Sequence, residues 1–114
     1  MSLDSQNRAP RPQAERAAVF FDRRELNLLL GLYGRMVAAG VWRDYAVAWS
    51  RDAAHFHVFR RTSETPLYRI EKRPALARRQ GAWSITAEGG LIVRRGHELE
   101  TVLRFFDRSR FRLV

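Results

Sequence analysis

Two alternating runs near the middle of the chain decide the fold: HFHVFRR at residues 55–61 and LYRIEKR at residues 67–73. In the first run, Phe56 and Val58 alternate with residues that are mostly polar or charged. In the second run, Tyr68 and Ile70 alternate in the same way. A period of two is typical of β-strands with one buried face. The short break between the runs, SETP at residues 63–66, predicts that the two strands are antiparallel neighbours.

The same pattern continues on both sides of this pair. Upstream, YAVAWS at residues 45–50 alternates and is followed by RDA, which has turn chemistry. Downstream, PALARRQG at residues 74–81 is a loop. AWSITA at residues 82–87 and LIVRR at residues 91–95 then form two strands around the hairpin turn EGG. Consecutive strands with short turns predict an antiparallel meander of four to five strands.

A helix is expected on each side of the meander. The sequence DRRE at residues 22–25 is a capping box, apolar residues at helical spacing follow it, and Gly40 is a natural stop. The second helix starts after Gly96 and carries an apolar stripe of Leu99, Val102, Leu103 and Phe106. The predicted fold class is therefore α+β, with one N-terminal and one C-terminal helix packed on one face of the sheet. That face carries the larger apolar side chains: Val47, Trp49, Phe56, Val58, Tyr68, Ile70, Trp83 and Ile85.

Length and composition limit the organisation of the chain. With 114 residues we expect a flexible polar tail over residues 1–18 and a single α+β domain over residues 19–114. The last residues, FRLV, are expected to add a short strand or to pack as a tail. The absence of cysteine excludes disulfides, thiol catalysis and cysteine-ligated metals. No apolar run of about 18 residues occurs and the start of the chain is polar, so we expect a cytoplasmic protein without membrane association.

The chain is strongly basic, with a net charge of +9 and a pI of about 11.4. Arginine carries this charge, since Lys72 is the only lysine among the 21 basic residues. A coding bias can explain the ratio of arginine to lysine, but not the excess of basic over acidic residues. Because a guanidinium group matches phosphate and carboxylate oxygens, the expected partners are nucleic acid or an acidic protein.

The second face of the sheet is the first candidate site. Arg61, Arg69 and Arg73 are expected to point the same way from adjoining strands with Phe59 beside them, while Arg78 and Arg79 lie on the neighbouring loop. Cations that neutralise phosphates and a ring that stacks on bases predict binding of single-stranded nucleic acid. The alternative is a charged face that serves only solubility. The full set on this face is expected to be Ala46, Ala48, His55, His57, Phe59, Arg61, Arg69, Glu71, Arg73, Ser84 and Thr86.

The histidines are a weaker candidate. His55 and His57 are two residues apart and project from one face of a strand, and His97 could supply a third zinc ligand. However, His97 is expected on the other side of the sheet, and no carboxylate is expected beside the pair as a base. Glu71, among arginines, suits a structural salt bridge. We expect no metal site, no cofactor and no enzymatic activity, because the phosphate-loop, dinucleotide-binding and nucleophile motifs are also absent.

The first helix suggests a second function. Its apolar arc is broader than one face, because Leu28, Leu32 and Met36 widen it, and this predicts either deep burial or a second contact. Gly31, Gly34 and Ala38 would let another backbone approach closely. The alternative hypothesis is therefore a protein-interaction or regulatory module that forms a homodimer through this helix.

Three stretches carry a resemblance to a known family. They are FDRRELNLLLGLYGRMVAAGVWRDYA at residues 21–46, FRRTSETPLYRIEKRPALARRQGAWSI at 59–85 and LIVRRGHELETVLRF at 91–105. The chain resembles the uncharacterised alphaproteobacterial domain-of-unknown-function family numbered 2794. The resemblance implies a cytoplasmic bacterial protein. It brings no activity, cofactor or catalytic residue.

Overall fold

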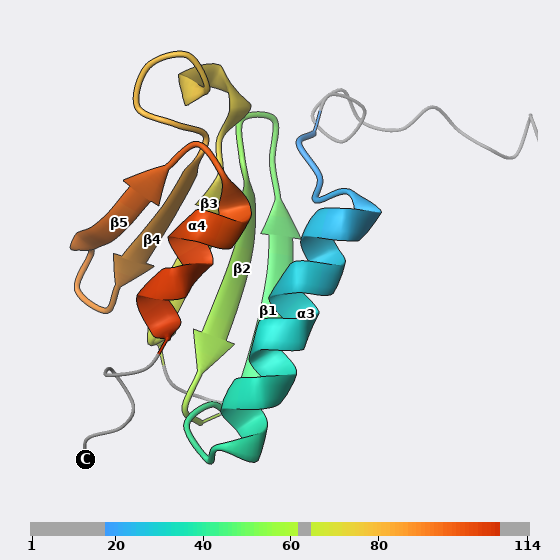
Figure 1. Ribbon diagram of the computed structural model, residues 1–114, viewed down its shortest axis with the longest axis vertical. Coiled ribbons are helices and arrows are strands. Elements are labelled where there is room, and N and C mark those ends of the chain that lie inside the picture. Colours follow the sequence, from blue (N-terminus) through green and yellow to red (C-terminus); the bar gives the residue numbers. More distant parts are fainter. Residues whose placement is uncertain (1–17, 62–64, 108–114) are drawn as a thin grey trace, which may run out of the picture.

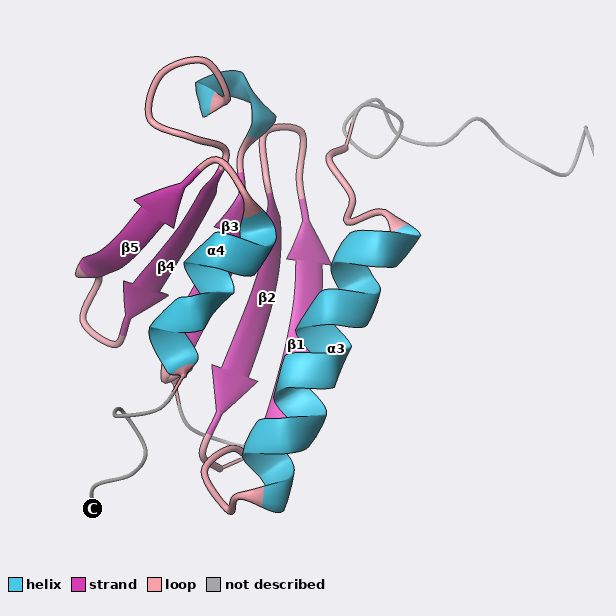
Figure 2. Ribbon diagram, viewed as in Figure 1, coloured by secondary structure: helices cyan, strands magenta, loops and turns pink. Residues whose placement is uncertain are grey.

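The computed structural model describes residues 18–61 and 65–107. The tail predicted over residues 1–18, apart from Ala18, and the segment FRLV lie outside the described residues. The elements are α3 (Arg23–Ala38), β1 (Asp44–Trp49), β2 (Ala54–Phe59), β3 (Tyr68–Lys72), β4 (Trp83–Ala87), β5 (Ile92–Gly96) and α4 (Leu99–Leu103), with 3-10 turns at Pro74–Leu76 and Arg104–Phe106 (Figures 1 and 2).

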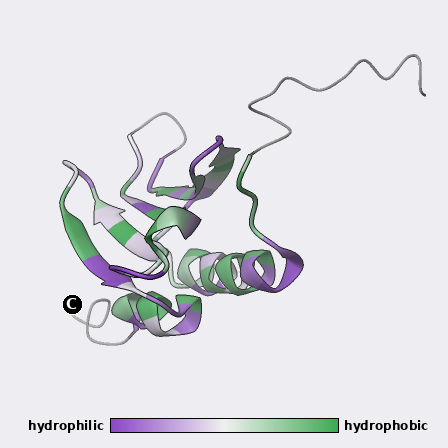
Figure 3. Ribbon diagram, turned by 90° about the horizontal axis from the view of Figure 1, so that it is seen from above, coloured by the Kyte–Doolittle hydropathy of each residue, from purple (hydrophilic) through white to green (hydrophobic). Residues whose placement is uncertain are grey.

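The predicted α+β fold is confirmed. The strands form one antiparallel sheet in the order β1-β2-β3-β4-β5, so each strand pairs with its neighbour in sequence. Figures 1 and 3 show both helices on the same side of this sheet. On the opposite side, which we call the outer face, no helix lies within the described residues.

The capping box at the start of α3 is also confirmed. Asp22 accepts a hydrogen bond from the Glu25 amide, and Glu25 accepts one from the Asp22 amide, each at 2.8 Å. The Glu25 carboxylate also accepts a hydrogen bond from the ammonium group of Lys72 at 2.7 Å. Lys72 lies 5.9 Å from the centre of the Trp83 ring. Lys72, the only lysine, therefore links β3 to the start of α3 through an ion pair. It does not belong to a basic binding surface.

The core lies between the sheet and the two helices. Phe56, Val58, Ile70 and Ile85 from the strands are fully buried. The helices contribute Leu29, Leu32 and Met36 from α3 and Leu99, Val102 and Leu103 from α4. Trp42, Trp83, Phe105 and Phe106 complete the cluster. Every residue of the apolar stripe predicted for the second helix is buried, although α4 proper ends at Leu103 and a 3-10 turn carries Phe106.

Trp49 differs from its predicted role. It was expected under the helices, but 48% of it is exposed. The reason is its position, because Trp49 is the last residue of β1 and β1 is an edge strand. Its ring packs against Phe20 at 5.2 Å. The helices therefore cover the centre of the inner face, which is the side of the sheet that packs against them, and leave the corner at Trp49 exposed to solvent.

Arg61 also differs from its predicted role. The first alternating run, residues 55–61, was expected to extend to Arg61, but β2 ends at Phe59. Arg61 lies beyond the strand and lines a pocket with Arg43 and Arg60, so the strand does not aim it along the outer face. The irregular register lies between β4 and β5, at Ile85 and Thr86, so the alternation in β2 and β3 is intact.

None of the described helices is both long and apolar enough to cross a membrane.

Candidate functional site on the outer face of the sheet

The strand register places small and polar side chains in rows across the outer face. Because each pairing is antiparallel, directly opposed residues share a face. The register is regular from β1 to β4 and shifts between β4 and β5 at Ile85 and Thr86. One row is Ala48, His55, Glu71, Ser84 and Arg95, and the next is Ala46, His57, Arg69 and Thr86.

Three rings lie in line along β2 on this face. The ring centres of His55 and His57 are 5.9 Å apart, and those of His57 and Phe59 are 6.4 Å apart. All three residues are half-buried. On the β1 side His55 and His57 are opposite Ala48 and Ala46, whose side chains are small, and Phe59 is opposite Asp44. We call His55, His57 and Phe59 the ring row. Because the two alanines are small, planar groups from outside can reach the rings of His55 and His57.

Glu71 organises the polar groups next to the ring row. Its carboxylate lies 3.0 Å from Nε2 of His55 and accepts a hydrogen bond from Nε of Arg73 at 2.9 Å. Burial alone would raise the pKa of Glu71, but the hydrogen bonds from Arg73 and His55 outweigh burial, so the net effect lowers the pKa. The same bond raises the pKa of Arg73. The predicted salt bridge of Glu71 is thus confirmed, and the expectation that no carboxylate lies beside the histidines is wrong.

His57 has a different environment from His55. Burial lowers its pKa, and the neighbouring His55 and Arg69 lower it further. Since the ordinary value is 6.5, the imidazole of His57 is uncharged at neutral pH. An uncharged ring keeps one donor and one acceptor nitrogen and stacks without the cost of desolvating a cation.

The predicted basic residues are distributed over the length of the sheet. Arg69 lies beside His57 in the middle of the outer face and is exposed. Arg73 is at the end of β3 and is paired with Glu71. Arg78 and Arg79 are exposed on the loop at that same end. Arg61 follows the end of β2, and because β2 is antiparallel to β3 it lies at the opposite end of the sheet. The structure therefore brings Phe59 and Arg69 onto one surface and puts the other cations at its two ends.

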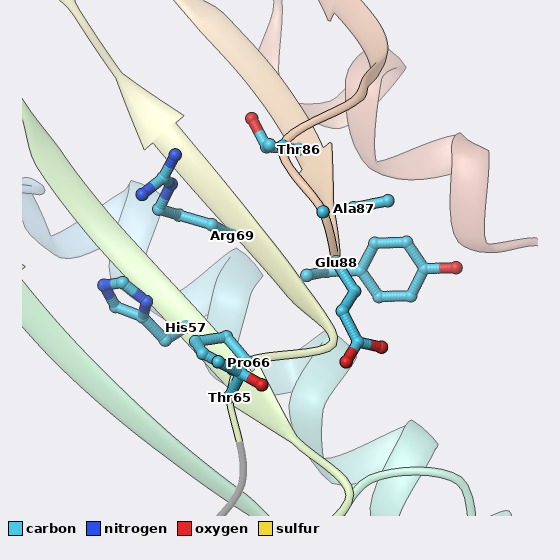
Figure 4. A pocket seen from close by; sticks show the side chains of 10 residues that line it. His57, Thr65, Pro66, Arg69, Thr86, Ala87 and Glu88 are labelled. Carbon is cyan, nitrogen blue, oxygen red and sulfur yellow. The ribbon is translucent and has the colours of Figure 1, made fainter.

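A pocket of about 270 Å³ opens beside Arg69. It lies between the segment before β3 and the turn between β4 and β5 (Figure 4). Its lining residues are His57, Thr65, Pro66, Tyr68, Arg69, Thr86, Ala87, Glu88, Gly89 and Gly90. Sequence reasoning missed this pocket. That the turn EGG lies close to Pro66 can be predicted only when the register of three strands is known.

The histidines do not form a three-ligand site with other residues. Within residues 18–61 and 65–107, no three histidine, cysteine, aspartate or glutamate residues gather closely enough to hold a metal ion. His55 is instead directed at Glu71. The contacts that the structure shows on the outer face are hydrogen bonds, ion pairs and ring contacts.

The broad arc of α3 is used mainly in the core. Leu29, Leu32 and Met36 are buried, whereas Val37 is 41% exposed. A Cβ added at Gly34 would meet nothing within 4 Å. The small residues of this helix therefore make no close backbone contact among the described residues.

Replacing Glu71 with glutamine is expected to lower the free energy of unfolding by about 1–3 kcal/mol near neutral pH, because it removes the charge that pairs with Arg73. The pKa of Glu71 is lower in the folded protein than its ordinary value of 4.5. Its contribution is therefore complete above that value and is lost as the pH falls through the lower folded pKa. Urea denaturation near neutral pH and at about pH 3 measures the difference, which should shrink in acid.

The matched control for this change is Glu100→Gln. Glu100 also pairs with an arginine, Arg24, but its side chain is 59% exposed. Exposed pairs contribute little, so this variant should change stability by less than about 1 kcal/mol at either pH. Equal effects of the two variants would show that the Glu71 network is not a stabilising feature.

Comparison with known proteins gives one match. The family model described as "Protein of unknown function (DUF2794)" matches residues 19–103. No curated protein and no solved structure matches the chain.

Proposed function

Since the chain belongs to the family of unknown function DUF2794, which supplies no activity, we propose from its geometry that it binds single-stranded nucleic acid across the outer face. The observation that carries the proposal is the ring row on β2 with the exposed Arg69 beside it, on a sheet face that no helix covers. Uncovered antiparallel sheets that present aromatic rings stack about two or three bases in common RNA-binding modules.

The arrangement fits a single strand better than a duplex. Stacking on the ring row needs bases whose faces are free, and a duplex keeps its bases stacked on one another. Arg69 adds positive charge beside the rings, and the exposed Arg78 and Arg79 would neutralise phosphates at one end of the face. A face that served only solubility would need the charges but not the half-exposed rings of His57 and Phe59.

Fluorescence anisotropy with labelled single-stranded and double-stranded oligonucleotides, at low and moderate salt, tests the proposal. We expect tighter binding of the single strand, with an affinity that falls steeply as salt rises. Phe59→Ala should weaken binding roughly 5-fold to 150-fold, the range for loss of one base stack, and leave the salt slope unchanged. Arg78→Gln should instead flatten the slope by about 0.7, the value for one phosphate contact on a single strand.

Two control variants match these changes in residue type. Phe20 is an aromatic residue with 44% exposure that packs on Trp49, away from the outer face. Arg35 is an exposed arginine on α3, on the helix side of the sheet. Phe20→Ala and Arg35→Gln should both bind as the unmodified protein does. Absence of binding at low salt would refute the proposal, and so would equal losses in the control and test variants.

A further inference from the structure

The pocket beside Arg69 has the size of a site for one base. Its volume of about 270 Å³ lies below the roughly 300–1,000 Å³ of sites for drug-sized ligands. It adjoins the ring row, because His57 belongs to both. A strand whose bases stack on the ring row would therefore pass the mouth of this pocket.

Its walls and rim differ in chemistry. Pro66, Ala87 and the two glycines of the turn give it apolar surface against which the face of a base can pack. Figure 4 shows Arg69 on β3 and Glu88 just after β4 on different sides of the pocket, with Thr86 further back along β4. The rim thus offers a guanidinium donor, a carboxylate acceptor and a hydroxyl at separate positions.

These rim groups have unused bonding capacity. Among the described residues, the side chains of Arg69, Thr86 and Glu88 make no hydrogen bond or ion pair with each other or with any neighbour. In contrast, Glu71 and Arg73 in the next row are paired. A ligand in the pocket would therefore gain contacts without breaking existing ones.

We propose that this pocket binds a guanine base, an inference that rests on the proposed binding of single-stranded nucleic acid. Guanine offers two adjacent donors, N1–H and the N2 amino group, to the carboxylate of Glu88. On its other side it offers the acceptors O6 and N7, which an arginine such as Arg69 contacts in the most frequent specific pairing with this base. Adenine has no hydrogen on N1 and no O6, so it would leave Glu88 facing a lone pair.

Four single-stranded oligonucleotides that differ only at one central position test this assignment. The background is uridine, and the central base is guanine, adenine, cytosine or uracil. Anisotropy titrations should show guanine bound roughly 5-fold to 150-fold more tightly than the other three, the range for one good bidentate contact. Glu88→Gln should reduce this ratio to near one, because the amide places a donor opposite the donors of guanine.

Glu98→Gln is the control, since it changes the net charge by the same amount. Glu98 is exposed and precedes α4, on the helix side of the sheet. This variant should keep the preference for guanine. A preference that survives Glu88→Gln, or equal binding of all four oligonucleotides, would overturn the guanine site and leave stacking on the ring row intact. Failure of every oligonucleotide to bind at low salt would overturn both.

Discussion

Replacing Gly81 with alanine is expected to lower the free energy of unfolding by about 3–5 kcal/mol, which places it among the largest effects of single substitutions. Gly81 is buried and has a φ of +100°, a backbone conformation that residues with a side chain rarely adopt. A Cβ there would overlap the carbonyl group of Gly96 and lie 2.9 Å from the amide nitrogen of His97. Because both neighbours are backbone at the end of β5, neither can move away without disturbing the sheet.

Gly89→Ala separates the two causes of this loss. Gly89 has a φ of +93°, but a Cβ there would meet nothing within 4 Å. Its substitution therefore costs only the backbone strain, about 1–2 kcal/mol. Urea denaturation of both variants measures the difference. Similar losses would show that the close approach between Gly81 and Gly96 does not constrain the fold.

Phe56→Ala is expected to cost about 3–5 kcal/mol, the range for removing a buried phenyl ring and leaving a cavity. Phe56 is 0% exposed and stacks on Tyr45 with ring centres 5.2 Å apart. Since a domain of this size has a total stability of about 5–15 kcal/mol, this loss should be evident in thermal and chemical denaturation.

Phe59→Ala is the matched control on the same strand. Phe59 lies on the outer face and is half-buried, so its removal leaves no closed cavity. We expect less than half the loss of stability found for Phe56→Ala, together with the weaker nucleic-acid binding described above. Equal destabilisation by the two variants would contradict the assignment of the two faces of β2.

Local patterns explain why the fold was predictable. The capping box at Asp22 and Glu25 is encoded within four residues, and the alternation of Phe56 and Val58 within one strand. Turns with characteristic residues, such as EGG, then fix the order of neighbouring strands. These signals need no knowledge of distant contacts, and all of them are found in the structure.

The remaining features depend on which residues meet across strands. The pairing of His55 with Glu71 depends on the register between β2 and β3. The sequence does not give the exact ends of the two strands, so it leaves the length of the loop and this register unspecified. The exposure of Trp49 follows from the edge position of β1, and the position of Arg61 from where β2 ends. The pocket beside Arg69 forms where the segment before β3 and the turn between β4 and β5 come together, and neither segment predicts this alone. Sequence reasoning could therefore name Phe59 and Arg69 and place Thr86 on the same face, but it could not name Glu88.

The order of the strands has a consequence for synthesis on the ribosome. Because each strand pairs with the one made just before it, the sheet can grow as the chain emerges, with little entropy lost to loop closure. Its inner face is not fully covered until α4 and Phe106 follow. Nascent chains that stop before residue 99 would thus expose Ile70 and Ile85, which makes the stage before release the one most prone to aggregation and to chaperone binding.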